Sequence, residues 1–155
     1  MIKINVITND NNWFKYLKKP NFYLNKKIKK LNSKLREFKK NDIFCTLLLS
    51  GNKEIKNLNK RFRKKDKITD ILSFPFHTKK KLKRKLKEVR EVYLGDIIIN
   101  INRIKSKKIK KNFDSEFDQL WIHGLVHLFG HDHKKDDDFK KMKKIEIKYF
   151  NIVND

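Results

Sequence analysis

Residues 123–133 read His-Gly-Leu-Val-His-Leu-Phe-Gly-His-Asp-His, and this stretch contains four of the five histidines of a 155-residue chain. Apolar residues recur every three or four positions before and within it, which predicts a buried helix over residues 113–129. Asp114 or Ser115 can cap the start of that helix. Gly130 permits the left-handed turn that ends a helix, so we expect the chain to double back there.

The spacing of His123, His127 and His133 is typical of a metal site. His123 and His127 are four residues apart, so their rings lie on one face of the helix and both can reach one ion. His133 follows the turn and can supply a third nitrogen. Three protein ligands leave the fourth position of a tetrahedral zinc open, as in catalytic sites. We therefore expect one Zn²⁺ on this triad, although imidazole also suits nickel, copper and iron.

The histidine spacing equals that of the metzincin peptidases, H-E-x-x-H-x-x-G-x-x-H. Their general base is the Glu after the first His, and Gly124 occupies that position here. A glycine side chain can neither take nor give a proton. The ligand set of a peptidase is therefore present, whereas its base is missing.

The chain carries 41 basic and 18 acidic residues, for a net charge of +23. Self-repulsion at this charge works against a compact state, which indicates a polyanionic partner such as RNA or DNA. An A+T-biased coding sequence also raises the lysine content, so composition is an alternative explanation for part of the charge.

The length predicts one domain over residues 1–155. Cys45 is the single cysteine, which excludes an internal disulfide and is compatible with a reducing compartment. No apolar signal segment opens the sequence, and no run approaches the ~20 apolar residues of a membrane span. We expect a cytoplasmic protein without a membrane partner.

Alternating and continuous apolar runs predict strands over residues 2–7, 43–50, 71–76 and 94–99. Helical periodicity predicts helices over residues 24–38, 53–62 and 113–129 and around 139–149. Ile55, Leu58 and Phe62 are expected to face inward, and Pro75 restricts its strand to an edge or an end. Residues 77–90 carry eight Lys or Arg and a single Glu. That composition predicts a mobile basic insertion, either solvated or in contact with nucleic acid.

Two stretches together resemble a known family. The first reads Leu58-Asn59-x-x-Phe62-Arg63-x-Lys65-Asp66-Lys67-x-Thr69-Asp70-Ile71-Leu72-Ser73-Phe74-Pro75-Phe76, and the second is the histidine stretch. Leu94-Gly95-Asp96-Ile97 matches a third, short piece. The combination resembles the YbeY-type rRNA maturation factors, which are zinc-dependent bacterial endoribonucleases, over roughly residues 45–150.

The resemblance implies a single-domain α/β (α+β) fold. A small mixed four-stranded sheet would be flanked by about five helices, with the metal site on a buried helix and the loop after it. It implies Zn²⁺ on the three histidines, a catalytic role for Arg63, and substrate binding by Arg63, Ser73 and Lys65. It also implies single-strand-specific cleavage in maturation of the 3′ end of 16S rRNA, ribosome quality control, and RNA and the ribosomal small subunit as partners, with ribosome-associated proteins among them.

The sequence departs from the family pattern at several positions. His131 stands where the family mostly has Tyr, and it is either an alternative ligand or proton carrier, or a tolerated exchange. Ile68 replaces a common Pro, and His77 replaces a common acidic residue. Arg63 also has a structural alternative, a surface salt bridge to Asp66.

The sequence leaves the general base open. Asp132 can act as the base or orient an imidazole, Asp70 and Asp96 can equally serve turns or caps, and attack by the 2′-OH of RNA is a further alternative. Two other functions fit the motifs. One is a peptidase-like zinc metallohydrolase, and the other is a ribosome-associated RNA-binding module whose zinc is structural.

Overall fold

A computed structural model describes residues 1–155 and contains one four-stranded mixed sheet with the strand order β1-β2-β4-β3. The strands are β1 (Ile2–Thr8), β2 (Asp42–Ser50), β3 (Ile71–Pro75) and β4 (Glu91–Asn100). β1, β2 and β4 are parallel, and β3 pairs antiparallel with β4 at the edge of the sheet. The predicted α/β architecture and the edge position of the Pro75 strand are therefore confirmed.

Five α-helices surround this sheet: α1 (Pro20–Lys34), α2 (Asn52–Arg63), α3 (Lys79–Glu88), α4 (Lys110–Leu128) and α5 (Asp136–Asn154). Three short 3₁₀ helices connect them, η1 (Asn11–Lys15), η2 (Arg36–Phe38) and η3 (Ile101–Arg103). None of the helices combines the length and the apolar composition that crossing a bilayer requires.

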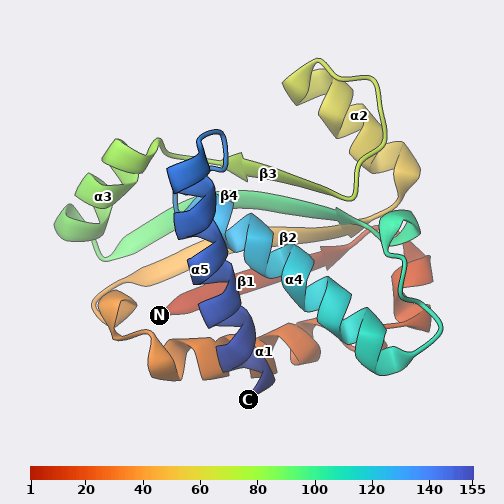
Figure 1. Cartoon of the computed structure of the whole chain (residues 1–155), viewed down its shortest axis with the longest axis horizontal. Helices are drawn as coiled ribbons and strands as arrows, with labels where there is room; N and C mark the ends of the chain where they lie inside the picture. Colours follow the sequence, from red (N-terminus) through yellow and green to blue (C-terminus); the bar gives the residue numbers. More distant parts are fainter.

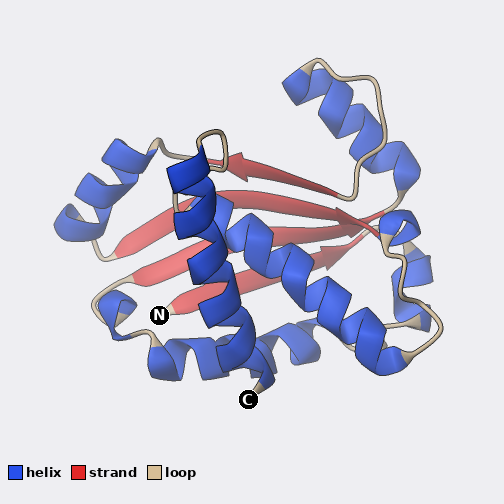
Figure 2. Ribbon diagram, viewed as in Figure 1, coloured by secondary structure: helices blue, strands red, loops and turns tan.

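One face of the sheet carries most of the helical layer, as Figures 1 and 2 show. α1 packs against β1, α4 lies over β3 and β4, and α5 crosses α1 and α4. Successive residues of a strand point to opposite faces, so Ile97 of β4 points to α4 while Ile98 joins Ile55 of α2 and Leu72 on the other face. The site described below lies on the α4 side.

The main core is one contiguous cluster of 30 buried residues, contributed by β1, β2, β4, α1, α4 and α5 among others. Alternation explains the strand contribution, since Ile2, Ile4 and Val6 are buried while the residues between them are exposed. A single core of this extent is what one domain requires. Trp13 and Phe117 pack in its centre with ring centroids 5.4 Å apart.

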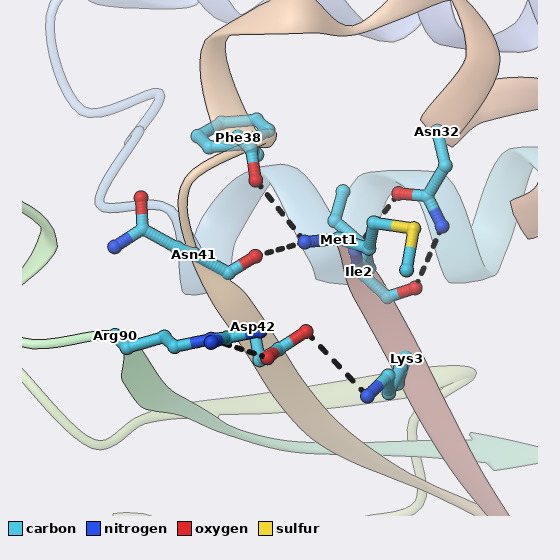
Figure 3. Close-up of polar contacts among 8 residues, drawn as sticks. All are labelled: Met1, Ile2, Lys3, Asn32, Phe38, Asn41, Asp42 and Arg90. Atoms are coloured by element: carbon cyan, nitrogen blue, oxygen red, sulfur yellow. Dashed lines mark hydrogen bonds and ion pairs between the residues drawn. The ribbon is translucent and has the colours of Figure 1, made fainter.

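Polar contacts fix the free edge of β1 (Figure 3). The side-chain amide of Asn32 donates to the carbonyl of Ile2 at 2.9 Å, and its oxygen accepts from the Ile2 amide at 2.8 Å. The amino group of Met1 donates to the carbonyls of Phe38 and Asn41. The Asn32 contacts give the outer edge of this strand partners that a neighbouring strand would otherwise supply.

The prediction of a mobile loop over residues 77–90 is wrong. Residues 79–88 form α3, whose N-cap Thr78 accepts from the amide of Lys81 at 3.3 Å. Leu82 is buried and Leu86 packs against the core at the following turn. These two leucines, four residues apart in a run of lysines, give the helix one apolar side, and that spacing outweighs the charge density.

Three smaller expectations are also corrected. α4 begins at Lys110, earlier than predicted, and neither Asp114 nor Ser115 caps it. Phe62 is 58% exposed, and it contacts the edge of Phe74 with ring centroids 5.5 Å apart. Ile55 is fully buried as predicted, whereas Leu58 is only partly buried.

Candidate metal centre

α4 positions the first two histidines of the site. Its apolar residues are buried on several sides, including Phe113, Phe117, Trp121 and Leu125. Asp118, also buried, accepts from Trp121 Nε1 at 2.9 Å and pairs with Lys27 Nζ of α1 at 2.8 Å. These contacts fix the rotation and height of α4 against α1, so the histidine face of the helix is held toward the edge strand β3.

The three predicted ligands converge. One ring nitrogen from each of His123, His127 and His133 lies within 4.8 Å of the others. The Nε2 atoms of His123 and His127 are 3.1 Å apart. His133 approaches from the loop after α4, with its ring centroid 5.0 Å from that of His127. Gly130, at φ +87°, makes the left-handed turn that brings this loop back.

Hydrogen bonds at the opposite side of two rings define which nitrogens are available. His123 Nδ1 contacts a carboxylate oxygen of Glu146 at 2.7 Å, and His127 Nδ1 contacts the carbonyl oxygen of His131 at 2.9 Å. The carbonyl oxygen and the ionised carboxylate have no proton to donate, so each can only accept a hydrogen bond. Both Nδ1 atoms therefore carry the proton. Two Nε2 lone pairs then face each other, an arrangement that a cation between them would stabilise.

Burial lowers the pKa of His127, and the neighbouring charge of His123 lowers it further. A lowered pKa favours the neutral imidazole at neutral pH, which is the form that binds a metal. The donor set, its convergence and its protonation all fit a metal ion. The triad could therefore hold one ion.

A cleft of about 760 Å³ opens onto the triad. Arg63 and Ser73 line it together with the three histidines, whereas Lys65 does not. Ser73 reaches the cleft because β3 lies at the edge of the sheet beside α4. Of the residues that the sequence predicted as metal ligands or for catalysis and substrate binding, the structure thus brings together all except Lys65.

Arg63 is the last residue of α2 and is exposed. The alternative of a salt bridge between Arg63 and Asp66 is not observed. The carboxylate of Asp66 pairs instead with two lysines, with Oδ2 at 3.4 Å from Lys60 Nζ and Oδ1 at 3.7 Å from Lys56 Nζ. The buried Asn59 secures the loop that follows Arg63 by donating to the carbonyl of Lys67 at 2.8 Å. Arg63 is therefore held at the rim of the cleft without a carboxylate partner.

The other acidic candidates have separate structural roles. Asp70 accepts from the amide of Ile71 at 2.8 Å, and Asp96 accepts from the hydroxyl of Tyr93 at 2.5 Å. Asp132 lines the cleft, but its observed bond is from the amide of His133 at 2.8 Å. The carboxylate that holds an imidazole is Glu146 of α5. Sequence reasoning missed it, although it is the only acidic residue between Phe139 and Asn154.

Gly124 points away from the triad. A Cβ added there would lie 2.7 Å from Cγ2 of Ile97 in β4, closer than side-chain carbons approach. A glutamate at this position would have to enter the contact between α4 and the sheet. The geometry therefore leaves no room for the peptidase base, in agreement with the sequence.

Known proteins resemble the chain over nearly its whole length. The family model described as "Endoribonuclease YbeY" matches residues 7–154. The Endoribonuclease YbeY of Pelagibacter ubique is 42% identical over 156 residues, which cover 99% of this chain and 97% of that protein. The protein of the same name from Thermodesulfovibrio yellowstonii is 33% identical, with 79% and 72% covered.

Among solved structures, the solution structure of TM1509 from Thermotoga maritima matches with a TM-score of 0.61 and 26% sequence identity. The match covers 97% of this chain and 89% of that protein. The family model and the identities agree with the site geometry. The chain belongs to the endoribonuclease YbeY family.

Proposed function

We propose that this protein is a metal-dependent endoribonuclease that acts in rRNA processing, with one zinc ion on His123, His127 and His133. The observation that carries the proposal is the convergence of three imidazole nitrogens in a cleft that Arg63 also lines. Family membership supports RNA as the substrate. It also supports the more specific assignment, cleavage of single-stranded precursor at the 3′ end of 16S rRNA on the ribosomal small subunit.

The residues of the chain would share the work as follows. Zinc, when bound, supplies Lewis-acid polarisation of a phosphoryl oxygen and lowers the pKa of water towards ~7. The planar guanidinium of Arg63 binds the scissile phosphate and offsets the negative charge that grows in the transition state. Ser73, which lines the cleft, would donate a hydrogen bond to a substrate oxygen. Lys65 does not line the cleft, so its proposed role is limited to contacting a phosphate of the RNA next to the scissile one.

The test is the variant Arg63→Ala, with Arg63→Lys as the conservative variant and Arg61→Ala as the matched control. Arg61 lies two residues earlier on α2, is exposed, and does not line the cleft. We expect Arg63→Ala to keep its fold and zinc content and to lose roughly 10²–10³-fold in the cleavage rate of precursor rRNA. Arg63→Lys should recover little, because an ammonium cannot bind phosphate through two parallel bonds.

Two outcomes would contradict the proposal. If the purified, metal-loaded protein bound precursor rRNA but did not cleave it, the protein would act as a binding module. A folded Arg63→Ala variant that cleaved at the rate of Arg61→Ala would refute the catalytic role of Arg63 alone. If the purified protein cleaved casein and no RNA, the peptidase alternative would replace it. Analysis of the purified protein for zinc, with cleavage measured before and after chelation, tests the metal. A 2′,3′-cyclic phosphate product would indicate attack by the RNA's own 2′-OH.

A further inference from the structure

A second concave surface lies away from the metal centre, between η1, α1, the start of α4 and the end of α5. We call it the lysine groove. Six of its lining lysines have no carboxylate within 4.0 Å: Lys15, Lys18, Lys19, Lys26, Lys30 and Lys111. Its one acidic lining residue, Asp114, is already paired with Lys110. Repulsion among these charges opposes folding, and a bound polyanion would offset it.

Aromatic side chains are interleaved with these lysines. Phe22, near the start of α1, is 70% exposed and packs against no other aromatic ring. Tyr16 lines the groove too and stacks on Phe113 with centroids 5.0 Å apart. An exposed ring among cations is the pairing that single-stranded nucleic acid uses, because bases stack on the ring while lysines contact phosphates. An acidic protein surface would use the lysines but not the exposed ring.

The groove connects with the metal centre along α4. Lys111, Ser115, Gln119, His123 and His127 are each four residues apart, so they form one row on the helix. Lys111 lines the lysine groove, Ser115 lines it and an adjoining hollow between α4 and α5, and His123 lines that hollow and the metal cleft. At 1.5 Å per residue, Lys111 lies about 18 Å from His123 along the helix. Figure 1 shows the course of α4, which packs against β3 and β4.

We propose that the lysine groove binds single-stranded RNA a few nucleotides away from the cleaved bond, with the strand following the α4 row to the metal cleft. This inference rests on the proposed endoribonuclease function and adds to it a second, distal contact with the substrate. The groove supplies affinity through phosphate contacts and through stacking on Phe22. The metal cleft supplies the chemistry, so the two parts can be separated by experiment.

The first test compares two triple variants with equal changes of charge. Lys18→Glu/Lys19→Glu/Lys26→Glu alters the groove, and Lys29→Glu/Lys39→Glu/Lys40→Glu alters exposed, unpaired lysines outside it. Glutamates at 18 and 19 precede α1, where its dipole favours negative charge, so the fold should be kept. Binding of a long single-stranded RNA is measured by anisotropy across salt concentrations.

The slope of log K against log salt is negative, and we expect it to be shallower by about 2 in the groove variant. Each lost phosphate contact removes roughly 0.7 from its magnitude on a single strand. The control should lower it much less. Equal slopes in the two variants would overturn the proposal, because the binding would then follow net charge alone.

The second test uses Phe22→Ala, with Phe139→Ala as the control, an exposed phenylalanine outside the groove. Loss of stacking should weaken RNA binding by between about fivefold and a hundredfold in Phe22→Ala only. Polyglutamate serves as the probe for an acidic protein partner. If polyglutamate bound as tightly as RNA and Phe22→Ala changed neither, the groove would serve an acidic protein surface and the RNA proposal would be wrong.

Cleavage assays separate this inference from the proposed function. The groove variant should cleave a trinucleotide that fits the metal cleft at the wild-type rate and show a raised KM for a long strand. If the wild-type protein cleaved neither substrate, the proposed function would be refuted. The salt dependence of RNA binding would still test whether the groove binds RNA. Wild type that cleaved both, with a groove variant indistinguishable from the control, would refute the groove alone.

Discussion

Glu146 is the residue whose position does most to define the candidate metal ligands. Its carboxylate contacts His123 Nδ1 at 2.7 Å and Lys143 Nζ at 3.3 Å, so it is held from two sides on α5. A carboxylate at this place fixes the ring orientation and makes the opposite nitrogen a better electron donor. The ligand geometry on α4 therefore depends on a side chain from another helix.

We predict that Glu146→Gln lowers zinc affinity by roughly 10–100-fold while the fold is retained. The neutral amide keeps the shape of the side chain but accepts a weaker hydrogen bond from the imidazole. Competition with a chromophoric chelator measures the affinity. Lys143→Ala is the control, because it removes the other partner of Glu146 and leaves the imidazole contact. Unchanged affinity in Glu146→Gln would mean that the carboxylate does not support the ligand.

At the scale of elements, the strands and the histidine helix could be predicted because their signals are local. Alternation in β1 and the apolar runs of β2 and β4 report burial directly. The sequence predicts a loop where α3 forms, because the many lysines of this segment conceal two leucines at helical spacing. It predicts too late a start for α4, because no side chain caps that helix and tertiary packing decides where it begins.

The residues of the site likewise divide into those that the sequence predicts and those that only the folded structure reveals. The three histidines fall within eleven residues, so periodicity and one glycine suffice to bring them together. The placement of Arg63 came from the family resemblance, and the structure shows it lining the cleft. Neither Glu146 nor the lysine groove was predicted, because each depends on elements far apart in the chain that meet only in the folded protein. No single-sequence pattern reports such a meeting.

A second prediction belongs to the segment before α4. Glu116 accepts from the amides of Lys105 at 2.9 Å and Ser106 at 2.8 Å, which ties this loop to the helix. Burial by itself raises the pKa of Glu116, but the two amide hydrogen bonds, the Ser106 hydroxyl and the charge of Lys105 together leave the pKa below the ordinary value of 4.5. A carboxylate with a lowered pKa stabilises the fold above its unfolded pKa, and that stabilisation is lost as pH falls through the folded value.

We therefore expect Glu116→Gln to unfold more easily than wild type at neutral pH, by about 1 kcal/mol, because an amide side chain offers one acceptor oxygen where the carboxylate offers two. The difference should shrink as pH falls below 4.5 and Glu116 becomes protonated in the wild type. Urea denaturation at a series of pH values measures it. Glu54→Gln, in the first turn of α2 and without a salt bridge, is the control. A difference that stayed constant with pH would rule out this role for the carboxylate.

For the whole molecule, the metal centre joins parts that the core already holds. The triad comes from α4 and the loop after it, and Glu146 adds α5. The contiguous core of 30 buried residues contains none of the three histidines, so we expect folding not to need the ion. That expectation separates a catalytic metal from a structural one, because small domains that use structural zinc are unfolded without it.

The last prediction follows from that separation. Metal-free protein should remain folded and unfold cooperatively, and zinc should then raise the free energy of unfolding by about 2.7 kcal/mol at a free concentration 100 times its Kd. Thermal denaturation with and without chelator measures both effects. His133→Ala should lose most of the zinc-induced shift, whereas His131→Ala, whose ring is outside the ligand cluster, should keep it. Unfolding on chelation would instead assign the zinc a structural role, and the binding-module function would then be the better account of this site.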